Sequence, residues 1–308
     1  MTSTAQGGAA AIARSHAAAR TLPGWAATVA LLLPTYAWLT LAVFMPLAAM
    51  LVFSVLTKAP FGNVHAELTT ANYLVFVRQP YLLNVAWTSL KLGFLTTALC
   101  ALIGLPAAMA LKHGADGRLR SVLFLLIILP FWTNGLVRIF SWTMVLREGG
   151  FLDMAWHLVA PAAPSIGILF SQPAIVIGLV HGYLPYMILT CFISLLAIDD
   201  SLIEAARSLG ARWPVIFARV VLPLVVPGLV SGGILIFVPV IGSFMEPRIL
   251  GGRVGVTMGT VIEDQFVQAF NWPLGAALSF TMLAVVLIIF AATSRLLSGL
   301  FGARAEPS

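Results

Sequence analysis

Apolar residues along this chain fall into six long stretches, and the short segments between them hold most of the charge. An α-helix rises about 1.5 Å per residue, so about 20 apolar residues cross the hydrocarbon core of a bilayer. Each stretch is therefore predicted to form a transmembrane helix, which makes the fold all-α and polytopic. The predicted spans are residues 21–57, 92–111, 121–137, 174–198, 220–245 and 265–294.

The two ends of the chain lie outside this pattern. The first apolar stretch is longer than the core of a signal peptide, which holds roughly 7–15 residues, so we predict a retained helix. Residues 1–20 are rich in Ala, Gly, Ser and Thr and are predicted to form a disordered cytoplasmic tail. A transmembrane domain is predicted at residues 21–298, and a second cytoplasmic tail at residues 299–308.

Composition agrees with a membrane protein. Hydrophobic residues make up 60% of the chain and charged residues 9%, and the mean hydropathy is +1.00. These values exclude an ordinary soluble domain. Cys100 and Cys191 both fall inside predicted spans, so we expect them to behave as small apolar residues and not as a disulfide.

Lysine and arginine set the predicted orientation, because they are enriched in cytoplasmic loops. With the N-terminus inside, ten lie on the inner side and five on the outer side. The inner ten are Arg14, Arg20, Lys112, Arg118, Arg120, Arg207, Arg212, Arg219, Arg295 and Arg304, and the outer five are Lys58, Arg78, Arg147, Arg248 and Arg253. Both termini and the segment 199–223 are therefore predicted to be cytoplasmic. The net charge of +6 follows from this bias and needs no nucleic-acid partner.

The segment 199–223 is the richest cluster of charge and lies between two apolar stretches. Ser201 and Glu204 have the spacing of a capping box, which satisfies orphan backbone donors where a helix begins. Gly210 is placed to end that helix in the left-handed conformation, and Trp213-Pro214 to start another. The pattern predicts two short helices separated by a glycine break, although an ordinary loop with a well-capped helix is the alternative.

The same segment resembles the EAA loop of ABC importer permeases, which reads Glu-Ala-Ala, three residues, Gly, nine residues, Ile, one residue, Leu-Pro. The matching residues are Glu204, Ala205, Ala206, Gly210, Val220, Leu222 and Pro223, and only Val220 departs from the pattern. The resemblance implies that residues 201–211 form a coupling helix that docks on a separate ATPase subunit. The small alanines would permit close docking, and the leucines would be apolar anchors. The implied coupling residues are Ser201, Leu202, Glu204, Ala205, Ala206, Leu209 and Gly210.

The third apolar stretch carries residues that lipid disfavours. Pro130 removes a backbone hydrogen bond and is predicted to kink or break the helix. Thr133, Asn134 and Gly135 are polar or small, which favours burial against protein or a cavity. Arg138 would cost roughly 2.5–3.5 kcal/mol at a helix centre, so we expect it to face a partner or water. The alternative is an arginine at the outer edge that reaches the headgroups.

Blocks at residues 129–142, 242–252, 259–262 and 271–277 resemble the permeases of spermidine/putrescine-type importers. The first block is most similar to the first of the two paralogous permeases in that family. The resemblance covers most of residues 32–296 and implies a type I ABC importer permease with six helices in a bacterial inner membrane. Its implied partners are a second, different permease, two copies of an ATPase that binds ATP, and a periplasmic solute-binding protein.

The resemblance also implies a polyamine substrate, with another small solute as the alternative. Carboxylates and aromatic faces attract such a cation. The candidate pathway residues are Trp132, Arg138, Trp142, Tyr183, Tyr186 and Glu246. For Glu246 an exposed position paired with Arg248 is equally consistent with the sequence, and Glu263 and Asp264 are expected to be ordinary interface charges.

The chain offers no sequence motif that would drive transport by itself. A P-loop needs Gly-Lys followed by Ser or Thr, and none of Lys58, Lys91 and Lys112 follows a glycine. The histidines and cysteines lack metal-ligand spacing, so no metal or cofactor is predicted. A secondary transporter driven by an ion gradient and a membrane enzyme are the competing classes. The first would show internal repeats and midplane carboxylates, and for the second His113 and Asp116 are the nearest catalytic pair.

Reporter fusions test the predicted orientation. A reporter fused after Lys112 and another after Ala211 should both be read as cytoplasmic, because ten basic residues lie on that side against five on the other. A fusion after Arg147 should be read as periplasmic and serves as the control. The measurement compares a reporter that is active only outside the membrane with one that is active only inside. A periplasmic signal at either of the first two positions contradicts the orientation.

Overall fold

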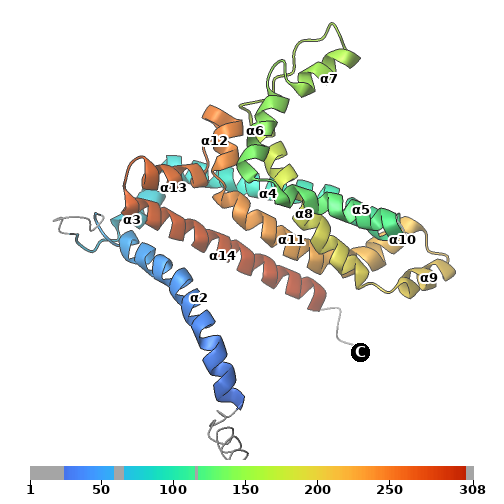
Figure 1. The fold of residues 1–308 in the computed structure, drawn as a ribbon, viewed down its shortest axis with the longest axis horizontal. Helices are drawn as coiled ribbons and strands as arrows, with labels where there is room; N and C mark the ends of the chain where they lie inside the picture. The colour runs from blue at the N-terminus through green and yellow to red at the C-terminus, as the bar shows by residue number, and fades with distance from the viewer. Residues whose placement is uncertain (1–23, 59–65, 115–116, 303–308) are drawn as a thin grey trace, which may run out of the picture. The chain divides into compact units, whose positions relative to one another are not determined.

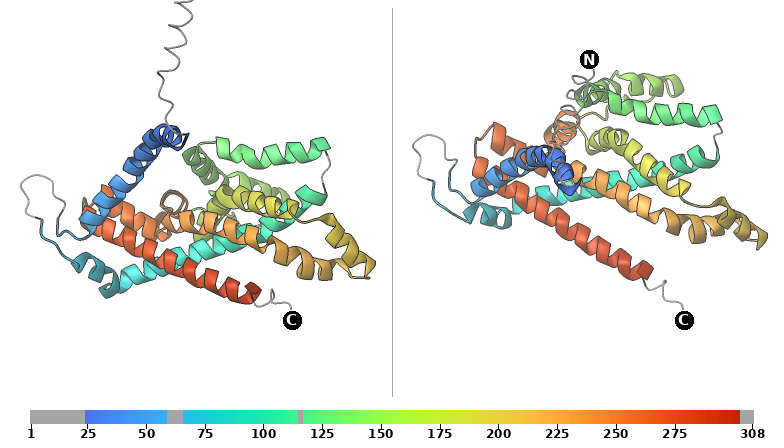
Figure 2. Two further views of the ribbon diagram at one scale, coloured as in Figure 1. Left: turned by 90° about the horizontal axis from the view of Figure 1, so that it is seen from below. Right: turned by 60° about the horizontal axis from the view of Figure 1, so that its bottom comes forward.

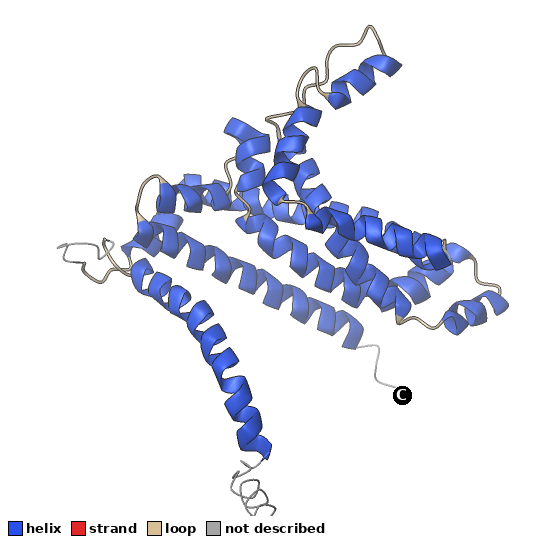
Figure 3. Ribbon diagram, in the orientation of Figure 1, coloured by secondary structure: helices blue, strands red, loops and turns tan. Residues whose placement is uncertain are grey.

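The computed structural model describes residues 24–58, 66–114 and 117–302, and almost all of these are helical (Figure 1 and Figure 3). Within the described ranges the β-structure is limited to an isolated bridge between Leu56 and Leu68, so the predicted all-α class is confirmed. The chain divides into two compact units, Met1–Phe53 and Ser54–Ser308. The tail predicted at residues 1–20 lies outside the described residues.

The first unit contains most of α2 (Gly24–Ser54). Its part Leu31–Ser54 is long and apolar enough to cross a membrane, which confirms the first predicted span. Pro34 and Pro46 lie inside this helix, where each removes one backbone hydrogen bond. The helix is apolar on all sides, as is typical of a helix that faces lipid.

Three long helices form the centre of the second unit. They are α4 (Pro80–His113), α8 (Gln172–Leu196) and α11 (Leu222–Gly242). The three pack against one another, as the views in Figure 1 and Figure 2 show, and share one buried apolar cluster. Cys100 of α4 and Cys191 of α8 are both buried in this cluster as free thiols, which confirms that they do not form a disulfide.

Glycines bring α11 very close to α8. A Cβ atom at Gly228 would lie 2.2 Å from Ser194 Oγ and 2.7 Å from the carbonyl oxygen of Thr190. A Cβ atom at Gly232 would lie 2.4 Å from Thr190 Oγ1. Lipid gives no hydrophobic drive for helices to associate, so membrane helices gain packing energy from small residues at such crossings. The α8–α11 crossing therefore depends on these two glycines.

The prediction of six single-helix spans is confirmed for five of them. The third apolar stretch is divided among three elements, which are α5 (Gly117–Ile128), a 3-10 turn (Leu129–Trp132) and α6 (Gly135–Leu146). Pro130 lies in the turn, so the predicted break is present. Asn134 starts α6 by accepting a hydrogen bond from the backbone nitrogen of Leu136 at 2.8 Å. Residues 121–137, all of them described, therefore do not form one continuous α-helix.

The last span begins later than predicted. Residues 265–267 belong to α13 (Met258–Val267), and the chain turns before it enters α14 (Trp272–Gly302). Phe270 has a φ of 49° in this turn. Asn271 then accepts a hydrogen bond from the backbone nitrogen of Leu274 at 3.3 Å. The apolar pattern missed this boundary because the residues on both sides of the turn are hydrophobic.

Short elements connect the long helices. They are α3 (Ala71–Arg78), α7 (Phe151–Val159), α9 (Asp200–Ser208), α10 (Trp213–Ile216), a π-helical turn (Phe217–Val221), α12 (Met245–Gly251) and a 3-10 turn (Gly252–Val254). A capping box formed by Thr257 and Thr260 begins α13. The backbone nitrogen of Met258 donates to Ser89 Oγ of α4 at 2.8 Å, and this buried bond attaches α13 to α4.

The α8–α11 crossing can be tested with two alanine substitutions in the same helix. Gly228→Ala should lower stability by about 1–3 kcal/mol, because the added methyl group meets backbone and side-chain atoms that cannot move away. Gly233→Ala is the matched control, since its Cβ would lie 3.5 Å from Thr97 Cγ2, an ordinary contact distance. The measurement is the melting temperature of the purified protein in detergent. Equal melting temperatures for the two variants would contradict the close crossing.

Candidate functional site

The first candidate site is α9 and the turns on either side of it, at one end of α8 and α11 (Figure 1). Asp199 has extended backbone angles and accepts a hydrogen bond from the backbone nitrogen of Ser201 at 2.9 Å, so Asp199 is the N-cap. This bond holds the pKa of Asp199 below its usual value. The predicted capping box of Ser201 and Glu204 is wrong, because α9 already begins at Asp200 and Ser201 lies inside its first turn.

The end of α9 agrees with the sequence. Gly210 has a φ of 80°, the left-handed conformation that was predicted for it. Its backbone nitrogen donates to the carbonyl oxygen of Arg207 at 2.9 Å, and that of Ala211 donates to Ala206 at 3.1 Å. These two bonds are those of a Schellman motif, which satisfies the last carbonyls of a helix. The helix ends at Ser208, so it is shorter than the predicted range 201–211.

The two faces of α9 have different surroundings. Ile203 is only 6% exposed and packs into the buried cluster of α4, α8 and α11, and Ala206 is half-buried against the same cluster. On the other face Leu202 is 48% exposed and Leu209 is 88% exposed, with the exposed Ala205 between them. The spacing of these three residues places them along one side of the helix. We call Leu202, Ala205 and Leu209 the free face of α9.

The free face revises the residue roles predicted from the sequence. Ala206 packs against the protein itself, so of the two alanines only Ala205 is open to a partner. Ser201 and Glu204 are exposed at the side of the helix. Ile203, which anchors α9, was missed because a single isoleucine in a charged segment gives no periodic signal. The residues three and four positions after Ile203 are Ala206 and Arg207, so no second large apolar side chain repeats at helical spacing in α9.

The second candidate site lies where α6, α8 and α12 meet. Trp142 of α6 donates from Nε1 to His181 Nδ1 of α8 at 3.2 Å, and the two rings meet edge to face with centroids 5.4 Å apart. The guanidinium of Arg138 lies over Gly182, where a Cβ atom would be 3.0 Å from its Nη2. Arg138 therefore packs against α8 through the space that the glycine leaves.

Aromatic rings and a carboxylate extend this site. Tyr183 and Tyr186 of α8 have ring centroids 6.1 Å apart, and Phe131 meets Tyr186 edge to face at 4.6 Å. Glu246 of α12 accepts a hydrogen bond from Ser243 Oγ, and its Cγ lies 4.0 Å from where a Cβ of Gly178 would be. Gly178 and Gly182 are one helical turn apart, so the carboxylate and the guanidinium approach neighbouring turns of α8.

The structure thus brings together five of the six predicted pathway residues and adds one. We define the α6–α8–α12 cluster as Arg138, Trp142, His181, Tyr183, Tyr186 and Glu246. Trp132 is 88% exposed and has no recorded contact with this cluster among the described residues. His181 was missed although it is the ionisable residue of the fourth span, and its spacing from Tyr183 and Tyr186 was the available signal.

Arg248 does not pair with Glu246. Its Nη2 donates to Asp264 Oδ1 at 2.6 Å and also binds Glu263, both on α13. These bonds, first of all the one to Asp264, raise the pKa of Arg248 above its usual value. Of the two alternatives that the sequence left open for Glu246, the pair with Arg248 is wrong, because α12 places Arg248 toward α13 and Glu246 toward α8. This leaves Glu246 bonded to a neutral hydroxyl.

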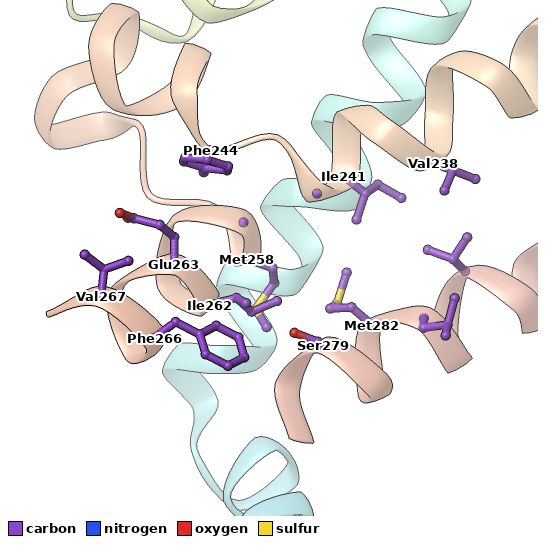
Figure 4. Close-up of a pocket in the computed structure, with 14 residues that line it drawn as sticks. Val238, Ile241, Phe244, Met258, Ile262, Glu263, Phe266, Val267, Ser279 and Met282 are labelled. Atoms are coloured by element: carbon purple, nitrogen blue, oxygen red, sulfur yellow. The ribbon is translucent and has the colours of Figure 1, made fainter. Parts of the chain in front are cut away.

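A cavity of about 470 Å³ lies among α11, α13 and α14, with Phe244 just before α12 also in its lining (Figure 4). Its walls are mostly apolar, with Phe244, Met258, Ile262, Phe266 and Met282 among the side chains drawn in Figure 4. Glu263 is the single charged residue of this lining, and Arg248 already binds its carboxylate. The cavity therefore lacks the polar groups that would orient a hydrophilic solute.

Long apolar helices around a polar and aromatic cluster, with a short amphipathic helix between α8 and α11, define a polytopic membrane transport component. Residues 100–305 match the model of a family described as "Binding-protein-dependent transport system inner membrane component", so the chain belongs to this family. It is accordingly a permease subunit of an ABC importer, a multi-pass inner membrane protein and a transport component rather than an enzyme.

Relatives of known function carry the same assignment. The spermidine/putrescine transport system permease protein PotB of Escherichia coli strain K12 is 34% identical over 264 residues, which cover 85% of this chain and 95% of the relative. PotB of Haemophilus influenzae is 34% identical over 266 residues, covering 85% and 92%. The molybdenum transport system permease protein ModB of Mycobacterium bovis is 26% identical over 252 residues, covering 80% and 90%.

Solved structures share the fold. A chain of a bacterial alginate ABC transporter, crystallised with a periplasmic protein bound to an alginate pentasaccharide, superposes with a TM-score of 0.71 at 14% identity. The superposition covers 85% of this chain and 90% of that chain. A chain of the methionine ABC transporter MetNI has a TM-score of 0.52 at 19% identity, covering 71% and 95%. At these sequence identities, the similarity to the two solved structures shows a shared fold.

Proposed function

We propose that this chain forms half of the translocation pathway of an ATP-driven importer for a polyamine such as putrescine or spermidine. The observation that carries the transport mechanism is the free face of α9, where Leu202 and Leu209 are exposed outside the long apolar helices. Two exposed leucines at one side of a short helix are typical of a helix that docks into a groove on another protein.

The partners follow from what the chain contains. It has no P-loop, so ATP has to be hydrolysed on a separate subunit, and the resulting movement has to be transmitted to this chain through a contact. We propose two copies of an ABC ATPase, one of which binds the free face of α9, and both termini on that cytoplasmic side. A second, different permease would complete the pathway, and a periplasmic solute-binding protein would deliver the substrate. The family description, which names binding-protein-dependent transport, supports this assembly.

The α6–α8–α12 cluster supports a cationic substrate. Glu246 accepts a hydrogen bond from a neutral serine and forms no recorded ion pair among the described residues, and the rings of Trp142, Tyr183 and Tyr186 offer π-faces. Arg138 would repel a cation, so we place the passing ammonium group on the Glu246 side of the cluster. The relatives named for spermidine and putrescine transport support the same substrate class.

The docking proposal predicts the effect of one charge on the free face. Leu209→Asp should abolish co-purification of the ATPase and uptake of substrate while leaving membrane insertion unchanged, because an exposed aspartate cannot be buried in an apolar groove. Leu158→Asp is the control, since Leu158 in α7 is 86% exposed and lies far from α9 in the chain. Normal ATPase binding by Leu209→Asp would refute docking at this face.

The shape of the turn after α9 can be tested separately. Gly210→Val should reduce uptake without loss of insertion, because valine in the left-handed conformation costs roughly 1–2 kcal/mol and moves the end of α9. Gly210→Asn is the control, since asparagine tolerates this conformation better than most residues. Uptake and ATPase activity are measured for both variants in the same complex. Equal uptake by the two would show that the glycine conformation is not needed.

Glu246→Gln tests the substrate class. Glutamine can still accept the hydrogen bond from Ser243 Oγ, so the local fold should persist while the charge is lost. The KM for uptake of labelled putrescine should rise about tenfold, the equivalent of roughly 1.4 kcal/mol. Glu246→Asp keeps the charge and should lie much closer to the parent value. An unchanged KM for Glu246→Gln would exclude Glu246 from cation binding, and absence of both putrescine and spermidine uptake by the parent complex would exclude a polyamine substrate.

A further inference from the structure

Lys112 occupies an unusual position near the end of α4. Its side chain is only 9% exposed although it carries a full charge. A buried ammonium is stable only when its donors are paired, because removing the charge from water costs several kcal/mol. The contacts of Lys112 show how this cost is offset, and they join segments that are far apart in the sequence.

Three acceptors surround the Lys112 ammonium. Nζ donates to the carbonyl oxygen of Leu195 at 3.0 Å and to that of Ile198 at 3.0 Å, and it forms an ion pair with Asp200 Oδ1 at 2.9 Å. A lysine ammonium has three N–H donors, so all of them are used. Leu195 is in the last turn of α8, Ile198 is in the linker, and Asp200 is the first residue of α9.

The backbone of Lys112 adds another helix to this junction. Its carbonyl oxygen, one of the four at the end of α4 that lack a partner within the helix, accepts a hydrogen bond from Arg120 Nη2 at 2.9 Å. Arg120 belongs to α5. Lys112 is therefore bonded to α5, α8 and α9 at the end of α4.

These bonds differ from the apolar contact that also anchors α9. Ile203 packs into the buried cluster through apolar contacts, which have no preferred direction. The bonds of Lys112 have fixed lengths and directions, and moving Asp200 away would leave a buried charge with an unpaired donor. The hydrogen bond from Lys112 also holds the pKa of Asp200 below its usual value, so the carboxylate form of Asp200 is lost only as the pH falls through that lowered pKa.

We propose that Lys112 is the positioning residue that transmits movement of α9 to α4 and α8. This inference rests on the proposed function, since α9 must receive the motion of an ATPase for the link to matter. When the docked ATPase displaces α9, Asp200 carries Lys112 with it, and the two carbonyl bonds carry the end of α8. Both α4 and α8 then move together at their shared end, while α8 holds three residues of the α6–α8–α12 cluster further along.

The test measures motion without relying on the identity of the substrate. In the assembled complex, Tyr186→Cys places a reactive thiol in the cluster, and its maleimide labelling is compared without nucleotide and with ATP plus vanadate. Labelling should change with nucleotide in this background. Adding Lys112→Met, which keeps the length of the stem but removes all three donors, should abolish the change while the ATPase still binds and hydrolyses ATP.

Controls separate the possible failures. Arg118→Met changes the net charge equally at an exposed position of α5 and should keep the nucleotide-dependent labelling. If Lys112→Met does not accumulate in the membrane, Asp200→Ala decides, because Asp200 is 66% exposed, so its removal should leave the fold intact while breaking the bond from Lys112 to α9 and reducing the change in labelling. An undiminished change in whichever variant assembles overturns the role of Lys112. No nucleotide-dependent change in the Tyr186→Cys background overturns the proposed coupling itself.

Discussion

A helix inside a bilayer has to satisfy its backbone polar groups within the protein, because lipid offers no hydrogen bonds. The places where this chain interrupts a helix are therefore places where another group takes over. Asn134 caps the start of α6 after the Pro130 break, Asn271 accepts a backbone N–H at the start of α14, and the Lys112 ammonium donates to two carbonyl oxygens where α8 gives way to α9. Both candidate sites lie beside such interruptions.

Close packing between the long helices holds these interruptions in place. The glycines of α11 bring it against α8, and the buried cluster of α4, α8 and α11 extends to Ile203 of α9. One packed unit therefore carries α9 at one end and contributes His181, Tyr183 and Tyr186 to the α6–α8–α12 cluster along α8. Since interiors at this density resist compression, a displacement at one end is more readily passed along the helices than absorbed.

Much of this arrangement was predictable from the sequence, because it depends on local or periodic signals. The lengths of the apolar stretches predicted five of the spans, Pro130 predicted the break in the remaining one, and Gly210 predicted the left-handed turn after α9. The wrong predictions concern which of several nearby residues caps a helix or pairs with a charge. Asp199 rather than Ser201 caps α9, since both residues are good caps and only the position of the helix start decides between them. Which partner Arg248 binds depends on how α12 faces α13, and no sequence pattern records that orientation.

The same limit applies to the two sites. Residue types and spacing pointed to most of the cluster, but the exposure of Trp132 and the contribution of His181 follow from how α6 approaches α8. Within α9, the division between inward Ile203 and outward Leu202 and Leu209 also needed the tertiary structure.

The outward leucines of α9 destabilise a subunit that has not yet met its partners, because they leave an apolar stripe in water. Such surfaces are what chaperones and proteases act on, and binding of a partner stabilises the folded form by mass action. The amount of this permease in a membrane would then be set by the supply of its partners as much as by its own synthesis.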